Sequence, residues 1–226
     1  MEIRNAKGQT EAEFLAAYNP DKYKKPSVTV DSVIITPSGS SLCLLLVNRK
    51  NHPFIYKWAL PGGFINSDED SESAARRELF EETGIKSDTV CQVRTFSRPD
   101  RDPRDRVVTI AYLGLAKENG IAPRAGDDAK KAELFKICVK QKEGIINISL
   151  NNGSETLSST VKVKRLFDVE VEIISSDLAF DHAEIIAHAL IKLAGTDSGC
   201  LSYALAPKDA DGIINTINRI KMIFKR

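Results

Sequence analysis

Residues Gly62–Ile85 read GGFINSDEDSESAARRELFEETGI and join a glycine pair to a run of acidic side chains. The stretch holds seven acidic residues and two arginines, a net charge of about −5, in a chain whose formal net charge is +1. From about Ser71 to Thr83 it is rich in Ala, Arg, Leu and Glu, and Gly84 follows. This composition predicts a helix that ends at the glycine.

Three carboxylates share one side of the predicted helix. At about 100° per residue, Glu81 and Glu82 lie about 60° and 40° to either side of Glu78. One interpretation is a solvated acidic face with salt bridges to Arg76 and Arg77. The other is a cluster of hard oxygen ligands for Mg²⁺ or Mn²⁺, whose charge would remove the repulsion between the glutamates.

The spacing of the whole stretch favours the ligand interpretation. It fits G-x5-E-x7-R-E-U-x-E-E-x-G-U, where U is a bulky aliphatic residue, at every fixed position. The matching residues are Gly63, Glu69, Arg77, Glu78, Leu79, Glu81, Glu82, Gly84 and Ile85. This pattern resembles the Nudix box, the signature of the Nudix hydrolases. The resemblance implies an α/β fold, an α/β/α sandwich around a mixed sheet, with the box forming a loop, helix and loop at the active site.

The resemblance also implies a reaction and the roles of several residues. Nudix hydrolases split a nucleoside diphosphate linked to another group, by attack of water on a phosphorus of the pyrophosphate. Because substrate and glutamates are both negative, divalent ions must bridge them. By this resemblance Arg77 would orient a glutamate and Glu69 would support it. The residues that would bind Mg²⁺ or Mn²⁺ are Glu78, Glu81, Glu82 and, through its backbone carbonyl, Gly62.

Segments outside the box resemble the ADP-ribose pyrophosphatases and the related Nudix regulators of NAD metabolism. They are NRKNHPFIYKWALPGGF, SRPDRDPRDRVVTIAYLGL, AGDDAKKAELF and LAFDHAEII, and together they cover much of residues 26–195. An enzyme of this group would convert ADP-ribose to AMP and ribose 5-phosphate. Sugar-nucleotide, NADH-like and oxidised-nucleotide substrates stay open, since the box indicates only a diphosphate linkage and a metal.

Further residues are candidates for substrate binding. The arginines of residues 97–106 carry planar donors that suit phosphate oxygens, although a polar hairpin tip explains the same charges. Asp127 and Asp128 would act as a general base or outer metal ligand, or belong to a solvated loop. Trp58 would stack on an adenine, or lie in the core as aromatic residues more often do. The substrate-binding candidates are Arg98, Arg101, Arg104, Arg106, Asp128 and Trp58.

Outside these candidate sites, alternating patterns predict the remaining elements. Residues 11–18 read as a helix, whereas 27–36, 41–49, 88–96 and 106–116 read as strands. The predicted domain spans residues 1–195: a core at about 26–139, a hairpin insertion at about 140–174 around the polar NNGSETLSS, and a closing helix at about 179–194. Asp181 is expected to cap that helix beside His182, a structural role for both residues.

The remaining residues 196–226 are expected to form a short, helical C-terminal extension. An apolar stripe along it is a candidate dimer interface, because related Nudix enzymes are commonly homodimers. The residues of the stripe are Ile213, Ile217, Ile220 and Phe224.

The composition restricts the class of protein. The 226 residues include 42% hydrophobic and 28% charged side chains, with 32 basic against 31 acidic residues. That is a globular composition, without the excess charge of a disordered chain or of a nucleic-acid or membrane binder. The sequence has no apolar run long enough for a membrane span or signal peptide, so a cytoplasmic location is expected.

Two functional hypotheses follow. The first is a metal-dependent hydrolase, favoured by the complete glutamate set. The second is an ADP-ribose-sensing transcriptional regulator, in which a Nudix domain precedes a winged helix. Only 31 residues follow Gly195, too few for a complete winged helix, so nucleic acid is not expected as a partner.

Overall fold

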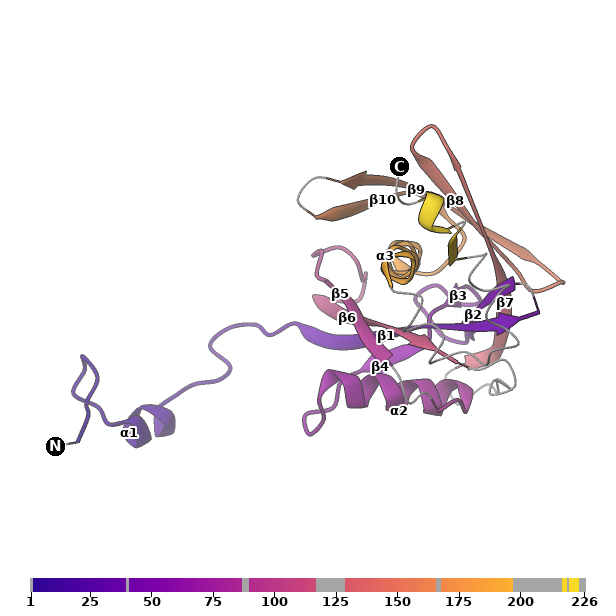
Figure 1. Cartoon of the computed structure of the whole chain (residues 1–226). Helices are drawn as coiled ribbons and strands as arrows, with labels where there is room; N and C mark the ends of the chain where they lie inside the picture. The colour runs from indigo at the N-terminus through magenta and orange to yellow at the C-terminus, as the bar shows by residue number, and fades with distance from the viewer. Residues whose placement is uncertain are drawn as a thin grey trace.

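The computed structural model describes residues 2–39, 41–86, 90–116, 129–165, 168–196, 217–218 and 220–223. In this part of the chain ten strands form one sheet with helices on its faces (Figure 1). The strands are β1 (Ser27–Ser38), β2 (Ser41–Arg49), β3 (Trp58–Ala59), β4 (Gly62–Phe64), β5 (Val90–Phe96), β6 (Val107–Leu115), β7 (Ala129–Lys142), β8 (Ile145–Asn151), β9 (Thr156–Arg165) and β10 (Val169–Ser176). The helices are α1 (Glu11–Ala16), α2 (Ser71–Thr83) and α3 (His182–Gly195).

The sheet is mixed, as predicted. Its strands lie in the order β10-β9-β8-β7-β2-β1-β6-β5, with β3 beside β2 and β4 beside β1. Strands β1 and β6 are parallel, from Ser27 opposite Val107 to Ile35 opposite Leu115. A parallel pair needs a long connection. Here that connection contains α2, so the helix of the box lies against the central strands.

The two longer helices cover opposite faces of the sheet, which confirms the expected layering. Helix α2 packs on β4 and β1, whereas α3 contacts β5 on one side and β9 and β10 on the other. Figure 1 shows the sheet bending around α3. Ten residues of α3 are buried. A helix that is apolar on most sides needs such an enclosed position.

Helix α2 forms where the sequence predicted it, because local signals mark both ends. The Asp70 side chain accepts a hydrogen bond from the Ser73 amide at 2.8 Å. Gly84 closes the helix in the left-handed conformation, at φ 71°. Ala74 and Leu79 are buried on the side of the helix that faces the sheet. The small Ala74 side chain lets the helix pack closely on the sheet, and Glu78, Glu81 and Glu82 of the same helix line a cavity.

The expected hairpin insertion is a larger structure. Strands β7, β8, β9 and β10 form an antiparallel meander that continues the main sheet. The polar NNGSETLSS contributes only a short turn, and its second half belongs to β9. The prediction of a single hairpin was wrong because β9 begins with Thr156–Thr160, where four of the five residues carry hydroxyl groups, so that its start resembles a polar connection.

The C-terminal stripe is used within the chain. Ile217 and Ile220 are 2% and 3% exposed and lie in the same core cluster as Leu190 of α3. The prediction that these residues form a dimer interface was therefore wrong. Ile213 and Phe224 lie outside the described residues.

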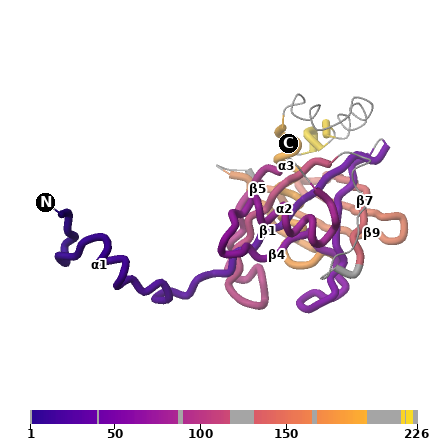
Figure 2. Tube along the Cα trace, turned by 90° about the horizontal axis from the view of Figure 1, so that it is seen from below, coloured from indigo at the N-terminus to yellow at the C-terminus, as the bar shows by residue number. Residues whose placement is uncertain are grey.

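Residues 2–24 form an N-terminal arm that extends away from the body (Figures 1 and 2). Its helix α1 begins with a capping box, in which Thr10 and Glu13 exchange hydrogen bonds, and buries none of its residues. Where the arm joins the body, Lys24 pairs with Asp105 at 2.7 Å. Among the described residues no helix has the length and apolar character needed to cross a bilayer.

Candidate active site

A cavity of about 770 Å³ lies at the point where α2, the start of α3 and the glycine turn meet. The glycine turn is residues 60–63, which lead into β4 and contain Gly62 and Gly63. The lining of the cavity comes from β1, the end of β2, the turn before β4, the glutamates of α2 and the arginine loop (residues 97–106). Among the predicted site residues, those that line it are Gly62, Glu78, Glu81, Glu82, Arg101 and Arg104. The structure thus brings the box and part of the arginine loop together.

The two glycines of the turn allow the backbone to approach its neighbours closely. A side chain at Gly62 would collide with the Val30 carbonyl of β1. A side chain at Gly63 would collide with the Glu78 carboxylate. The Gly62 amide donates to Glu82 Oε2 at 2.9 Å. The turn therefore determines where two of the three glutamates lie.

Arg77 organises the carboxylates around it. Its guanidinium donates to Glu69 Oε1 at 2.5 Å, to Glu78 Oε1 at 2.7 Å and to Glu81 Oε2 at 3.0 Å. A further bond to the Phe64 carbonyl, at 3.0 Å, ties the fork to β4. Arg77 thus holds Glu69, Glu78 and Glu81 around one guanidinium.

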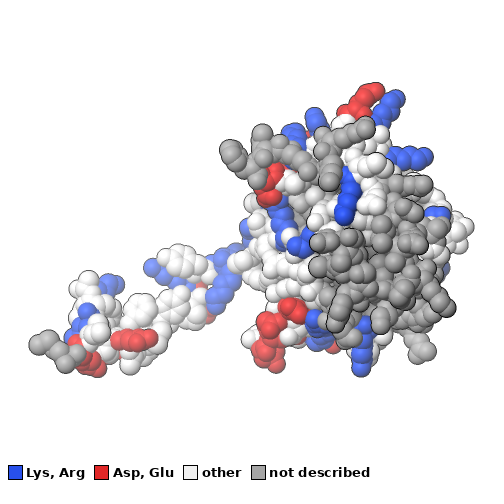
Figure 3. Space-filling model, in the orientation of Figure 1, with Lys and Arg blue, Asp and Glu red and all other residues white. Residues whose placement is uncertain are grey.

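The acidic groups differ in their protonation behaviour. Burial raises the pKa of Glu78, although Arg77 opposes this by binding the ionised form. Glu69 shows the opposite shift: its hydrogen bond from Arg77 and one from the Asn66 amide lower its pKa. In Figure 3 one group of acidic side chains lies at the lower left of the body, next to basic ones, on the side where Figure 1 places α2.

The donor chemistry of the three cavity glutamates fits a hard divalent cation. Carboxylate oxygens are the ligands that Mg²⁺ and Mn²⁺ prefer. Among the described residues, however, no three acidic, histidine or cysteine side chains are arranged so that they could hold a metal ion together. The reason is visible in the contacts, since Arg77 holds Glu78 and Glu81 and the Gly62 amide holds Glu82. Arg77 carries one positive charge and therefore offsets only part of the charge of these three carboxylates.

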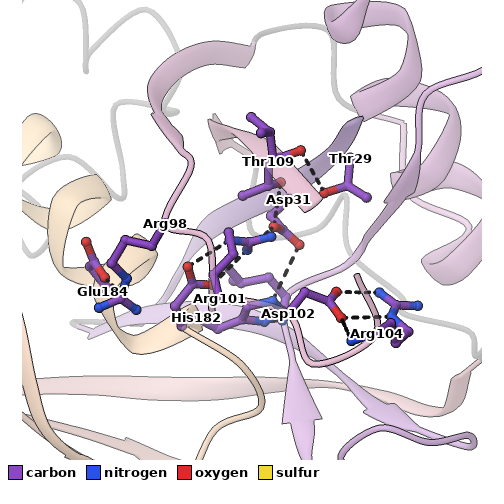
Figure 4. A network of polar contacts seen from close by, with 12 residues as sticks. Thr29, Asp31, Arg98, Arg101, Asp102, Arg104, Thr109, His182 and Glu184 are labelled. Atoms are coloured by element: carbon purple, nitrogen blue, oxygen red, sulfur yellow. Dashed lines mark hydrogen bonds and ion pairs between the residues drawn. The ribbon is translucent and has the colours of Figure 1, made fainter. Parts of the chain in front are cut away.

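A buried polar network adjoins the cavity (Figure 4). Arg101 donates two hydrogen bonds to Asp181, at 2.8 and 2.7 Å, and lies 3.6 Å from Asp31 Oδ2. The Thr109 hydroxyl donates to the same Asp31 oxygen at 2.7 Å. Burial alone would lower the pKa of Arg101, but the bonds to Asp181 and the nearby acids raise it. Arg101 thus joins the arginine loop to β1 and to the start of α3.

Arg104 lies on the open side of the cavity. It forms a forked pair with Asp102, at 3.0 and 2.7 Å, and its side chain is 44% exposed. Its guanidinium stacks over the rings of Phe64, at 5.5 Å, and Phe180, at 5.7 Å. Arg49, from the end of β2, lies 4.9 Å from the same Phe180 ring. Two cations and two aromatic rings thus meet at this end.

The other substrate-binding candidates lie elsewhere. Arg98 lies 3.6 Å from Glu184 of α3, and Arg106 donates to the Arg98 carbonyl at 3.4 Å. Trp58 is 4% exposed, and its indole donates to Glu155 at 2.9 Å. None of Arg98, Arg106 and Trp58 is among the residues that line the cavity. Asp127 and Asp128 lie outside the described residues.

Asp181 stands at the N-cap position of α3 but makes no capping hydrogen bond with its side chain. The expectation that it caps the helix was wrong, because Arg101 engages both of its carboxylate oxygens. Sequence reasoning also missed Asp31, Arg49 and Phe180. A signal existed for Asp31, the one acidic residue in the apolar run SVTVDSVIIT. None existed for Phe180, whose position depends on the fold.

With fold and site in view, comparison with known proteins places the chain in a family. A model of the NUDIX domain matches residues 25–139, about half of the chain. The chain therefore belongs to the Nudix family, as the spacing of the box indicated.

Relatives within the family include both regulators and enzymes. The chain is 32% identical to the ADPR responsive transcriptional repressor NtrR of Acinetobacter baylyi, over 81% of this chain and 61% of that protein. It is 42% identical to an ADP-ribose pyrophosphatase of Methanocaldococcus jannaschii, over 50% of this chain and 63% of that protein. It thus matches less than two thirds of the length of either relative. A solved MutT/nudix family protein from Enterococcus faecalis shares 33% identity and a TM-score of 0.71, over 96% of this chain and 82% of that one.

Proposed function

We propose that the chain is a metal-dependent hydrolase that cleaves the pyrophosphate of a nucleoside diphosphate linked to another group. Its proposed substrate is ADP-ribose, split into AMP and ribose 5-phosphate. The observation that supports this most is that Glu78, Glu81 and Glu82 line one cavity of about 770 Å³. That volume suits a ligand of nucleotide size.

The residues around the cavity have different proposed roles. A divalent cation held by the glutamates, with the Gly62 carbonyl, would neutralise the diphosphate and activate the attacking water. Arg77 orients Glu78 and Glu81, and its own donors are taken up by protein acceptors. Arg104 is exposed on the open side and would offer its free edge to phosphate oxygens.

The test is to remove one cavity charge while keeping the local hydrogen bond. In Glu82→Gln the side-chain oxygen can still accept from the Gly62 amide, so the turn should stay in place. We expect kcat/KM for ADP-ribose to fall by about 100-fold or more. The matched control is Glu72→Gln on the same helix, a residue 2.8 Å from Arg76 and outside the cavity. AMP release is measured by chromatography with Mg²⁺, with Mn²⁺ and with a chelator. Full activity in Glu82→Gln would reject the assignment.

The substrate is tested by comparing classes of phosphoanhydride. ADP-ribose, NADH and nucleoside diphosphate sugars are incubated with the chain beside nucleoside triphosphates. We expect cleavage of the linked diphosphates and little of the triphosphates. Preference for triphosphates would reject ADP-ribose as the substrate.

A second candidate function is an ADP-ribose-responsive transcriptional regulator. It is favoured by the extent of similarity, since the match with the repressor covers 81% of this chain and that with the pyrophosphatase 50%. In this role the cavity would bind ADP-ribose without cleaving it. Calorimetry would measure ADP-ribose binding, and chromatography would show whether the ligand is recovered intact. Binding without cleavage, together with a salt-dependent gel shift of promoter DNA that ADP-ribose reverses, would favour the regulator. Release of AMP without a shift would favour the hydrolase.

We also propose that the chain forms a homodimer through its N-terminal arm. Phe14, Leu15 and Tyr18 are 46%, 62% and 58% exposed, and Figure 3 shows the arm projecting from the body. A helix of six residues is marginal alone, so burial against a second copy would stabilise it. Light scattering after gel filtration should show a dimer that becomes a monomer when Phe14, Leu15 and Tyr18 are all changed to Ser. The same mass for both proteins would reject this interface.

A further inference from the structure

The turn formed by residues 60–63 determines the positions of two cavity glutamates. Gly62 binds Glu82 through its amide, and Gly63 lies directly against the Glu78 carboxylate. A displacement of this turn would therefore move or release both acids. Residues that hold the turn therefore also affect the positions of Glu78 and Glu82.

The beginning of α3 holds the turn from the side opposite α2. His182 Nδ1 accepts a hydrogen bond from the Leu60 amide at 2.8 Å. Just before the helix, the Ala179 amide donates to the Trp58 carbonyl at 2.9 Å. The His182 ring is 4% exposed, so solvent cannot easily take its place as an acceptor. These bonds join two parts of the chain that are far apart in sequence.

The position and tautomer of His182 are themselves fixed. Because Nδ1 accepts a hydrogen bond, the proton of the neutral ring is on Nε2, which lies 3.5 Å from Asp31 Oδ1. Burial lowers the pKa of His182 and keeps the ring neutral. A proton on Nδ1 would point at the Leu60 amide and break the bond. The neighbouring Asp181 is held by the two bonds from Arg101.

We propose that His182 is a positioning residue of the active site: through the Leu60 amide it fixes the glycine turn against the glutamates of α2. Asp31 lies 3.5 Å from His182 Nε2, and Arg101 holds the neighbouring Asp181 and lies 3.6 Å from Asp31 (Figure 4). The kinetic consequence rests on the proposed hydrolase function. The hydrogen bond itself can be tested without that function.

Three variants of the full chain separate positioning from stability. His182→Leu removes the acceptor, whereas His182→Asn places an amide oxygen near the position of Nδ1. His188→Leu is the matched control, since His188 is a second buried histidine of α3 that packs on Phe96 and does not line the cavity. We expect His182→Leu to lower kcat for ADP-ribose by about 10- to 100-fold with KM little changed. His182→Asn should recover most of that loss, and His188→Leu should keep the kcat of the folded wild-type protein.

A second measurement needs neither metal nor turnover. In ¹⁵N-labelled protein we expect hydrogen exchange of the Leu60 amide to rise about tenfold in His182→Leu. It should stay near the wild-type rate in His182→Asn and His188→Leu. The ¹⁵N shifts of the His182 ring should report an unprotonated Nδ1 and a protonated Nε2.

The outcomes are distinct. Equal losses of kcat in His182→Leu and His188→Leu, or a protonated Nδ1, would overturn the proposal. If His182→Leu does not fold, His182→Gln replaces it, because its amide reaches the position of Nε2 and not that of Nδ1. Higher kcat and slower Leu60 exchange in His182→Asn than in His182→Gln support positioning, and equal values overturn it. If the wild-type chain cleaves no diphosphate, the proposed function fails, while the Leu60 exchange rates still decide the positioning claim.

Discussion

Replacing Gly63 with alanine should damage the site without unfolding the protein. The new methyl group would overlap the Glu78 carboxylate. Ordinary contacts between such atoms are about 3.5–4.0 Å, so the carboxylate must retreat by about 1 Å. Gly63 is not in the left-handed backbone region, so alanine adds no backbone strain. The cost should therefore fall on catalysis.

The magnitude follows from that displacement. A misplacement of about 1 Å in a catalytic constellation costs about 100-fold in rate, equivalent to about 2.7 kcal/mol of activation free energy. We expect kcat/KM for ADP-ribose to fall by that factor and the melting temperature to change little. Calorimetric titration with Mn²⁺ should show weaker binding, which gives a readout that does not depend on turnover.

Two further variants make this prediction refutable. Glu78→Asp shortens the carboxylate by one methylene, so the double variant with Gly63→Ala should lose less than the sum of the single effects. Gly153→Ala is the control, because Gly153 is in the left-handed region at φ 91° with open space around it, in a turn away from the cavity. It should lose stability and keep kcat. Wild-type kcat/KM and Mn²⁺ affinity in Gly63→Ala would refute the reasoning.

Two other predictions concern stability. Arg101→Met should lower the free energy of unfolding by about 3–5 kcal/mol, because it leaves Asp181 buried without its partner, whereas Arg98→Met should cost about 1 kcal/mol or less. Urea denaturation of both variants measures this, and equal costs would contradict the structural role of Arg101. Burial lowers the pKa of His188 to about 4, below the value of about 6.5 expected in the unfolded chain. As the pH falls, the unfolded state therefore binds the proton first. The contribution of neutral His188 to the free energy of unfolding is present above about pH 6.5 and is lost as the pH falls toward 4. His188→Leu should flatten the pH dependence of unfolding over that range, and an unchanged slope would show that another group causes it.

Local signals were enough to predict the helix and the glutamates that it carries. Asp70, Gly84 and the spacing of the glutamates all lie within one short stretch, so the sequence alone indicates their arrangement. The layered mixed sheet also followed, through the family resemblance.

Contacts between distant segments could not be predicted in this way. Arg101 was expected to bind phosphate, yet its partner Asp181 is 80 residues further along the chain and meets it only when α3 packs onto the sheet. A basic residue in a polar loop has the same local pattern whether it faces a ligand or a buried acid. Strand β9 was missed for a different reason, since its hydroxyl-rich first half, Thr156–Thr160, has the composition of a polar connection.

The bending of the sheet around α3 has a consequence for the behaviour of the protein at high concentration. Strands β5 and β10 end the order of strands in the described part of the sheet. Arg94 of β5 donates to the Val169 carbonyl of β10 at 2.8 Å and pairs with Asp168 at 3.1 Å. An unpaired strand edge is a template on which another chain can add a strand and begin to aggregate. One arginine that spans the gap occupies part of that template on β10 and places charge beside β5. We therefore expect the curvature that encloses the core also to reduce the tendency of these two edges to seed aggregation.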